Sequence, residues 1–312
     1  MQNRNSFSLK GVFFASISLV LLGIMPVLSF SRPSGYNALL FAFWLSFWQL
    51  VCAFLQLIQE SRKDKRFFTV LSDSFRSVNL LFTGGLFALS TWLYVLAFDK
   101  VGPVNAAIAL QMYPIFSAVT EWGLYRKKKT PHEIFWMSII VLALFHLTTN
   151  GTWMPTGDMA GFMVALAVPA LWSIAHVILR ETLIRTSITP SQITVTRLII
   201  TCIFLFPATL ITLPEQQLLR SLFSADFQIF ALTMGGCYYL ELIFWFNAVR
   251  YIDVSLASTI TAPSPVITMI LSSLFLSEQV SSVQFYVMLL VFTSLFMLLR
   301  GSRVKKIKMT SV

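Results

Sequence analysis

Residues 97–115 read AFDKVGPVNAAIALQMYPI, and residues 248–266, which lie 151 positions later, read AVRYIDVSLASTITAPSPV. The aligned pairs are Ala97 with Ala248, Val101 with Ile252, Ala106 with Ala257, Pro114 with Pro265 and Ile115 with Val266. Both copies show the end of one apolar span, a short turn and a second span rich in small residues with a proline near its middle. Together they predict an internal repeat, and a repeat largely determines the architecture of a chain.

The composition places this repeat in a membrane. Of the 312 residues, 56% are hydrophobic and only 12% are charged, which is about half the charged fraction of soluble domains. A soluble globule with this composition would expose apolar side chains over most of its surface. The formal net charge of +10 fits basic cytoplasmic loops. We therefore expect membrane lipids around the chain and no nucleic-acid partner.

Ten apolar segments are long enough to cross a bilayer as helices, which takes about 17 to 25 residues. They are 11–31, 37–58, 78–98, 101–125, 134–150, 160–179, 191–213, 227–249, 254–276 and 283–299. Their apolar residues run continuously, whereas the strands of a membrane barrel alternate with a period of two. The sequence predicts an all-α integral membrane protein with ten transmembrane helices, of which the first is a retained span and not a cleaved signal peptide.

The ten predicted spans divide equally about the polar segment 151–158. Because five is an odd number, two successive five-span units must cross the membrane in opposite directions. The sequence thus predicts two inverted five-helix repeats, residues 1–155 and residues 156–312.

The positions of the basic residues predict the orientation. With the N-terminus in the cytoplasm, 20 of the 23 Lys and Arg residues lie on the cytoplasmic side, and only Arg32, Lys100 and Arg220 lie outside. Cytoplasmic loops carry an excess of Lys and Arg. We expect a multi-pass protein of the cytoplasmic (inner) membrane with both termini in the cytoplasm.

The repeat pattern resembles the EamA-type repeat of the drug/metabolite transporter superfamily. The resemblance rests on Ala97, Ala106 and Pro114, on their second copies Ala248, Ala257 and Pro265, and on Glu278, which resembles the acidic residue that closes the family motif. The first copy has Lys127 at the corresponding place. The resemblance implies transport of small metabolites by alternating access, with amino acids or drug-like solutes as substrates.

Glu241 is the most informative polar residue at membrane depth. It lies near the middle of the eighth predicted span, and Tyr238 and Trp245 share its helical face at spacings of three and four residues. A carboxyl group at this depth must face a wet cavity or a partner. We predict a proton-coupling site or an anchor for a cationic substrate group; the alternative is a Glu that only hydrogen-bonds a neighbouring helix.

Other side chains extend the predicted binding site. Trp172 and His176 lie four residues apart on one face of the sixth span, where they could stack a planar solute and donate a hydrogen bond. Trp92 adds another aromatic ring, while His146 is more typical of a packing residue. Glu121 and Arg197 lie near predicted cytoplasmic helix ends, where snorkelling explains them.

The two repeat prolines are predicted hinges. Pro114 and Pro265 should each kink a helix near the midplane and leave a carbonyl without its helical partner. Gln111 lies one turn before Pro114, and Thr261 lies one turn before Pro265. Both polar side chains are therefore expected at the repeat interface, next to the substrate.

The leading functional prediction is a secondary transporter, either an exporter or an exchanger, of a small-molecule substrate, as a monomer or a homodimer. The chain has no GxxxxGK[ST] motif that would indicate ATP, and its three cysteines show no CxxC pair that would indicate a metal site. We predict neither a cofactor nor a metal.

Three alternatives stay open at the level of the sequence. They are a transporter for nucleotide-type cofactors, an integral-membrane enzyme acting on lipid-like substrates, and a channel. The enzyme would usually need clustered carboxylates or a His with an Asp at a membrane face, and a channel would usually need rings of polar residues.

Overall fold

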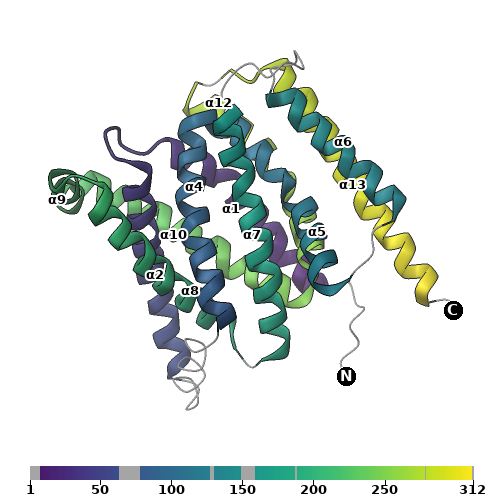
Figure 1. The fold of residues 1–312 in the computed structure, drawn as a ribbon, viewed down its shortest axis with the longest axis horizontal. Helices are drawn as coiled ribbons and strands as arrows, with labels where there is room; N and C mark the ends of the chain where they lie inside the picture. The colour runs from purple at the N-terminus through teal and green to yellow at the C-terminus, as the bar shows by residue number, and fades with distance from the viewer. Residues whose placement is uncertain are drawn as a thin grey trace.

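The computed structural model describes residues 8–62, 78–126, 130–148, 159–186, 188–277 and 279–310, and every regular element in these ranges is a helix (Figure 1). The elements are α1 (Leu9–Phe30), α2 (Ala38–Ser61), α4 (Val78–Ala109), the short 3-10 helix η1 (Leu110–Met112), α5 (Tyr113–Tyr125), α6 (Pro131–Thr148), α7 (Met159–Arg185), α8 (Pro190–Thr212), α9 (Glu215–Phe223), α10 (Ala225–Tyr251), α11 (Val254–Thr261), α12 (Ser264–Phe275) and α13 (Ser282–Thr310). The predicted all-α class is confirmed for this part of the chain. Glu278, Lys127 and the segment 151–158 lie outside the described residues.

Polar side chains determine where several apolar helices begin. Asn37 accepts a hydrogen bond from the Leu39 N–H at 2.8 Å, directly before α2. Thr189 and Gln192 form a capping box at the start of α8, in which each side chain accepts the backbone N–H of the other residue. These contacts satisfy N–H groups that the first helical turn leaves without partners. The apolar runs of the sequence therefore begin as helices at defined residues.

Six helical stretches in the described part of the chain are long and apolar enough to cross a membrane. They are Leu9–Phe30, Ala38–Ser61, Val78–Tyr125, Met159–Arg185, Pro190–Thr212 and Ala225–Tyr251. The stretch Val78–Tyr125 has 48 residues, more than twice the length that one crossing needs, and it contains the third and fourth predicted spans. Shorter apolar helices fall within the fifth, ninth and tenth predicted spans. The chain is a multi-pass membrane protein.

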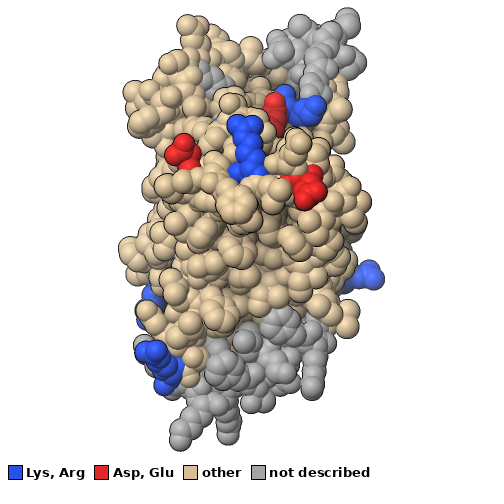
Figure 2. Space-filling view, turned by 90° about the vertical axis from the view of Figure 1, so that its left-hand side faces the viewer, with Lys and Arg blue, Asp and Glu red and all other residues tan. Residues whose placement is uncertain are grey.

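The distribution of charge on the surface agrees with a membrane location. Figure 2 shows a band of uncharged side chains across the face that it presents, with charged residues above and below the band. Large apolar side chains such as Ile211, Ile203 and Phe206 are exposed, which a lipid environment tolerates and water does not.

The helix contacts form matched pairs. α1 packs against α10 and α12, while α7 packs against α4 and α5. In the same way α2 packs against α10, and α8 packs against α4; α2 also contacts α8, and α6 lies along α13 (Figure 1). Exchanging α1 with α7, α2 with α8, α4 with α10, α5 with α12 and α6 with α13 leaves this set of contacts unchanged. A two-fold relation between the halves has this property.

One helix was not predicted from the sequence. The nine residues of α9 lie between α8 and α10, and Leu219, Leu222 and Phe223 on it are exposed. The indole N–H of Trp44 donates to the Ser221 hydroxyl at 3.0 Å and so ties α9 to α2. A short helix with exposed apolar side chains is typical of the membrane interface.

A pair of glycines in α10 tests the packing of this helix on α2. A Cβ atom at Gly235 would lie 2.8 Å from the Gln49 backbone nitrogen and 3.0 Å from the Leu45 carbonyl oxygen, whereas a Cβ at Gly236 would meet nothing within 4 Å. Because backbone atoms cannot rotate away, Gly235→Ala should lower the free energy of unfolding by about 1–3 kcal/mol. Gly236→Ala should leave it unchanged or raise it by up to about 1 kcal/mol. Unfolding midpoints of the purified variants in detergent measure both, and equal midpoints would contradict the packing.

Candidate functional site

Helices are interrupted at matching positions of the two repeat copies. In the first copy Gly102 lies inside α4 with φ 76° and ψ 165°, a backbone conformation that favours glycine, and η1 then separates α4 from α5. In the second copy α10 ends at Tyr251, α11 begins at Val254, and a turn at 262–263 separates α11 from α12. The shift of 151 residues aligns both interruptions with their counterparts.

The repeat prolines lie directly after the second interruption of each copy. Pro114 stands in the first turn of α5, and Pro265 stands in the first turn of α12. The expectation that each kinks a continuous helix and frees a carbonyl is therefore wrong, because each proline begins a new helix. In the first turn the missing N–H has no helical partner to lose. The hinge function of these residues stays a prediction.

A small cavity lies between η1 of the first copy and the turn at 262–263 of the second copy. Its volume is about 40 Å³; it is lined by Leu22, Pro26, Ala107, Leu110, Gln111, Tyr113, Pro114, Trp172, Ser258, Thr261 and Ser264. The Gln111 amide donates to the Ser264 hydroxyl at 3.5 Å and so links the two copies. The structure thus brings Gln111 and Thr261 to one place, and no side chain caps the N-terminus of α5 or α12 there.

An aromatic cluster adjoins this cavity. We define it as Phe87, Tyr94, Tyr113, Trp172, His176, Tyr238 and Trp245. The ring centroid of Tyr94 lies 5.5 Å from that of Tyr238 and 5.4 Å from that of Trp172. The ring centroid of Trp245 lies 5.6 Å from that of Tyr113 and 5.3 Å from that of His176. Four predicted site residues, Trp172, His176, Tyr238 and Trp245, therefore belong to one continuous set of ring contacts.

Two charged residues flank the aromatic cluster. Glu241 Oε1 accepts a hydrogen bond from the Ser18 hydroxyl at 2.6 Å, and the Arg197 guanidinium carbon lies 4.0 Å from the centre of the Phe87 ring. Both side chains are buried, with 6% and 5% exposure, and their opposite charges attract each other. A buried charge is costly unless it is paired or hydrogen-bonded; among the described residues, Glu241 contacts the Ser18 hydroxyl and Arg197 contacts the Phe87 ring. The structure places Glu241 beside its face neighbours on α10, as the sequence predicted.

Five buried polar atoms at the aromatic cluster have no hydrogen-bond partner among the described residues. They are Tyr94 Oη, His176 Nε2, Arg197 Nε, Tyr238 Oη and Trp245 Nε1. More than about 90% of buried polar groups in proteins are paired, and each unpaired one costs about 1–3 kcal/mol. The His176 Nδ1 atom is satisfied by the Tyr113 hydroxyl at 2.6 Å. Because five unpaired atoms gather at the aromatic cluster, this cluster is the candidate binding site.

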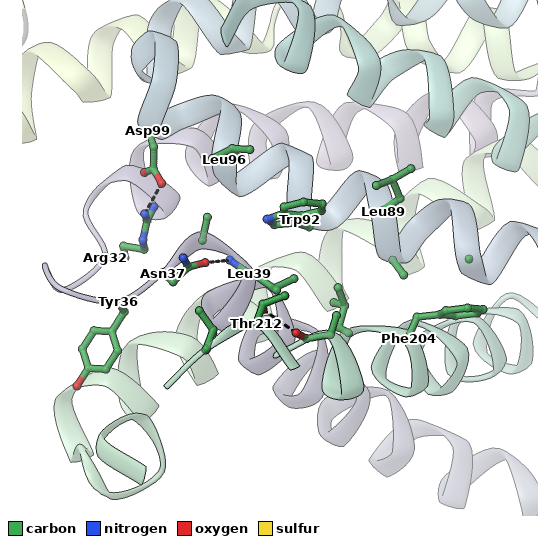
Figure 3. Close-up of a pocket in the computed structure, with 16 residues that line it drawn as sticks. Arg32, Tyr36, Asn37, Leu39, Leu89, Trp92, Leu96, Asp99, Phe204 and Thr212 are labelled. Atoms are coloured by element: carbon green, nitrogen blue, oxygen red, sulfur yellow. Dashed lines mark hydrogen bonds and ion pairs between the residues drawn. The ribbon is translucent and has the colours of Figure 1, made fainter. Parts of the chain in front are cut away.

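Trp92 lies apart from the aromatic cluster. It lines a groove of about 650 Å³ between α4, α8 and the start of α2 (Figure 3). The ion pair of Arg32 with Asp99, at 2.5 Å, stands at one end of this groove, and Phe204 stands at the other. Of the eight predicted binding residues, Trp92 is the one that the structure separates from the rest.

The structure adds Ser18, Tyr94, Tyr113 and Arg197 to the site. The snorkelling explanation for Arg197 is wrong, because its side chain is buried at the aromatic cluster. It lies seven residues after the start of α8, about 10 Å into the helix, and this depth is a signal that could have revealed it. Glu121, which we also attributed to a helix end, is 3% exposed.

The paired interruptions, the buried polar centre and the long apolar helices define a multi-pass membrane protein of the transporter type. The model of the EamA-like transporter family matches residues 9–149 and again residues 159–300. The chain belongs to the EamA-like transporter family, as its repeat pattern predicted.

The fold recurs in a protein of known crystal structure. The structural alignment covers 94% of this chain and 98% of the other protein's chain, with a TM-score of 0.66 and 14% sequence identity. At this identity the likeness shows the fold alone. No curated protein matches the sequence.

A double-mutant cycle tests the interaction of the two buried charges. Arg197→Met removes the buried positive charge that attracts the Glu241 carboxylate, although these two described residues form no direct ion pair, and should lower the free energy of unfolding by about 0.5–3 kcal/mol. Adding Glu241→Gln removes the isolated charge, so the double variant should lose less than the sum of the single losses by at least about 1 kcal/mol. Unfolding in detergent measures all four proteins. Arg185→Met, which removes an exposed ion pair with Glu181, should cost under about 1 kcal/mol; strictly additive losses at Arg197 and Glu241 would contradict the interaction.

Proposed function

We propose that the chain is a secondary transporter that moves small organic solutes across the cytoplasmic membrane by alternating access. We call the small cavity and the adjoining aromatic cluster together the buried centre. The observation that carries the proposal is that unpaired polar atoms and aromatic rings gather in this centre, beside the helix interruptions of both repeat copies. In secondary transporters, substrate sites lie near the bilayer midplane at the repeat interface and are formed by discontinuous helices.

The proposed architecture has ten spans in two inverted five-helix repeats, residues 1–155 and 156–312. Three observations support it: the exchangeable helix contacts, the aligned interruptions and the two successive matches to the family model. With five spans in each repeat, equivalent helices run in opposite directions across the membrane. The two halves can then rock against each other and expose the centre to either side in turn.

The closed packing of the centre supports movement between the halves. The cavity of about 40 Å³ is far smaller than the sites of about 300–1,000 Å³ that hold organic ligands. A solute therefore enters only when the helices around the interruptions separate. This arrangement corresponds to a closed state between the two open ones.

The aromatic cluster favours planar or amphipathic solutes, because stacked rings provide apolar contact and their polar tips bind polar groups. Amino acids and drug-like solutes have this chemistry, and the proposed direction is export or exchange. Glu241, held by Ser18, is the proposed coupling residue or anchor for a cationic group.

The proposed orientation places both termini in the cytoplasm. It rests on the 20 of 23 Lys and Arg residues on that side and on the positive-inside rule. On the face in Figure 2, Asp and Glu lie only above the uncharged band, whereas Lys and Arg lie on both sides of it. The lower end in that view is the proposed cytoplasmic side.

Counterflow in proteoliposomes tests the proposed function and the role of Glu241. Labelled aromatic and aliphatic amino acids serve as probes, and we expect saturable counterflow without covalent change. Glu241→Gln removes the titratable group but keeps its size, so the pH dependence of counterflow should disappear or transport should stop while the protein stays folded. Glu215→Gln, at an exposed position on α9, is the matched control and should behave as wild type. A Glu241→Gln variant with the wild-type rate and pH profile would give Glu241 a structural role, and product formation without solute movement would overturn the transporter.

The prolines provide a separate prediction about movement. Pro114→Ala and Pro265→Ala permit a helix to continue through the interruption, because alanine restores an N–H and relieves the restriction on the preceding residue. Each variant should slow exchange more than it weakens ligand binding, as expected for a hinge. Exchange rates in proteoliposomes and binding in detergent measure the two effects. An equal loss of both would argue for direct contact with the solute.

A further inference from the structure

At the end of the aromatic cluster formed by Trp245, His176 and Phe87, the unpaired atoms include groups that can only donate hydrogen bonds. Trp245 Nε1 and Arg197 Nε can donate but cannot accept, and neither has a partner within the described residues. A chain of ring contacts connects the two side chains. The ring centroid of His176 lies 5.3 Å from that of Trp245 and 5.1 Å from that of Phe87. The Arg197 guanidinium carbon lies 4.0 Å from the centroid of Phe87. Two obligate donors therefore lie at the same end of the cluster.

His176 adds to the donors at this end. Its Nδ1 atom lies 2.6 Å from the Tyr113 hydroxyl. When Tyr113 donates this bond, the neutral imidazole carries its proton on Nε2, and Nε2 is one of the unpaired atoms. Glu241 accepts from Ser18 through Oε1, and although its second oxygen can also accept, none of the three donor atoms, Trp245 Nε1, Arg197 Nε and His176 Nε2, is bonded to it. A ligand at this end must therefore bring acceptors of its own.

The backbone beside this end points to the same chemistry. The half-helices α5 and α12, of 13 and 12 residues, both begin at the small cavity, and no side chain caps either N-terminus. Helix N-termini carry partial positive charge; here the Tyr113 and Val266 N–H groups already donate to the Leu110 and Pro263 carbonyls, so the contribution of the two helix starts is their dipole. Tyr113, the first residue of α5, lines the cavity and also contacts Trp245. The cavity and the donor end are thus neighbours.

We propose that the donor end, formed by Trp245, His176 and Arg197 next to the α5 and α12 N-termini, binds the oxyanion of the transported solute, a carboxylate or a phosphate. The inference rests on the proposed function for the transport step and adds the chemical class of the solute. An oxyanion offers several lone pairs to neighbouring donors, and charge-assisted hydrogen bonds are stronger than neutral ones. Arg197 supplies positive charge at this end of the cluster, which it shares with Glu241. Tyr94 and Tyr238, at the opposite end, face the remainder of the solute.

Matched ligands test the proposal on the purified full-length protein in detergent. The probes are phenylacetate, phenyl phosphate and the neutral analogue phenylacetamide, each added at the same concentration. A ligand that binds the folded state raises its unfolding midpoint. We expect phenylacetate or phenyl phosphate to raise the midpoint and phenylacetamide to leave it unchanged. The comparison of the first two tells a carboxylate site from a phosphate site.

Variants that each remove one polar group locate the site. Trp245→Phe keeps a ring and removes the N–H, so it should weaken binding of the stabilising acid by about 10- to 100-fold. Tyr238→Phe removes a hydroxyl at the other end and should weaken it less. Trp122→Phe, at a 54% exposed position, is the matched control and should bind as wild type.

Three outcomes would overturn the proposal: neither acid stabilises the protein, the amide stabilises it as much as the acids do, or Trp245→Phe binds the acid as wild type does. The readout is binding, so it is independent of solute flux. A protein that binds the acid but shows no counterflow supports the oxyanion site and contradicts the proposed transporter. Counterflow of neutral solutes without acid binding contradicts the oxyanion site and supports the proposed transporter.

Discussion

Lipid cannot hydrogen-bond a peptide group, and this constraint governs the rest of the structure. Continuous helices satisfy it along α1, α2 and α7, whereas the regular α-helical pattern is interrupted at η1 and at residues 262–263. Such backbone is tolerated at membrane depth only where protein covers it. α7 packs over η1 and α5, and α1 packs over α11 and α12, so each interruption is covered by the first helix of the other half. The interface between the halves therefore exists because the interruptions need cover.

The buried centre combines rings that stabilise the closed state with polar atoms that oppose it. Tyr94 is 1% exposed and Trp245 is 2% exposed, so their rings contribute apolar burial while the hydroxyl and the indole N–H lose their water partners. Close helix contacts elsewhere hold the centre closed, as where a Cβ at Gly23 would lie 2.5 Å from Ile267. A solute that pairs the polar atoms removes the opposing contribution, which links binding to the closed packing.

The sequence predicted what depends on periodicity and composition, and it failed where packing between distant helices decides. The apolar runs, the repeat pattern and the prolines identified the helices and the place where the copies meet, and the face of Glu241 on α10 was correct. Tyr94 was missed because nothing local shows which side of a long apolar helix turns inward, whereas Arg197 was missed although its depth in the helix was a visible signal. Trp92 lies in a separate groove, since Tyr94, two residues further on, occupies the face of α4 that contacts the aromatic cluster; its role in binding stays a prediction.

The repeat relation separates the chemistry of the site into shared and unshared parts. The shift of 151 residues aligns Trp245 with Tyr94 and Tyr238 with Phe87, so aromatic rings stand at equivalent places in both halves. The charged and titratable residues lack such counterparts: Glu241 aligns with Ser90, Arg197 with Ser46 and His176 with Met25. In the proposed mechanism, ring contacts would therefore be available from either half, whereas contacts with Glu241, Arg197 and His176 would come from the second half. A solute bound through its charged group would keep one orientation and move with the second half, while its apolar body exchanges one set of rings for the other.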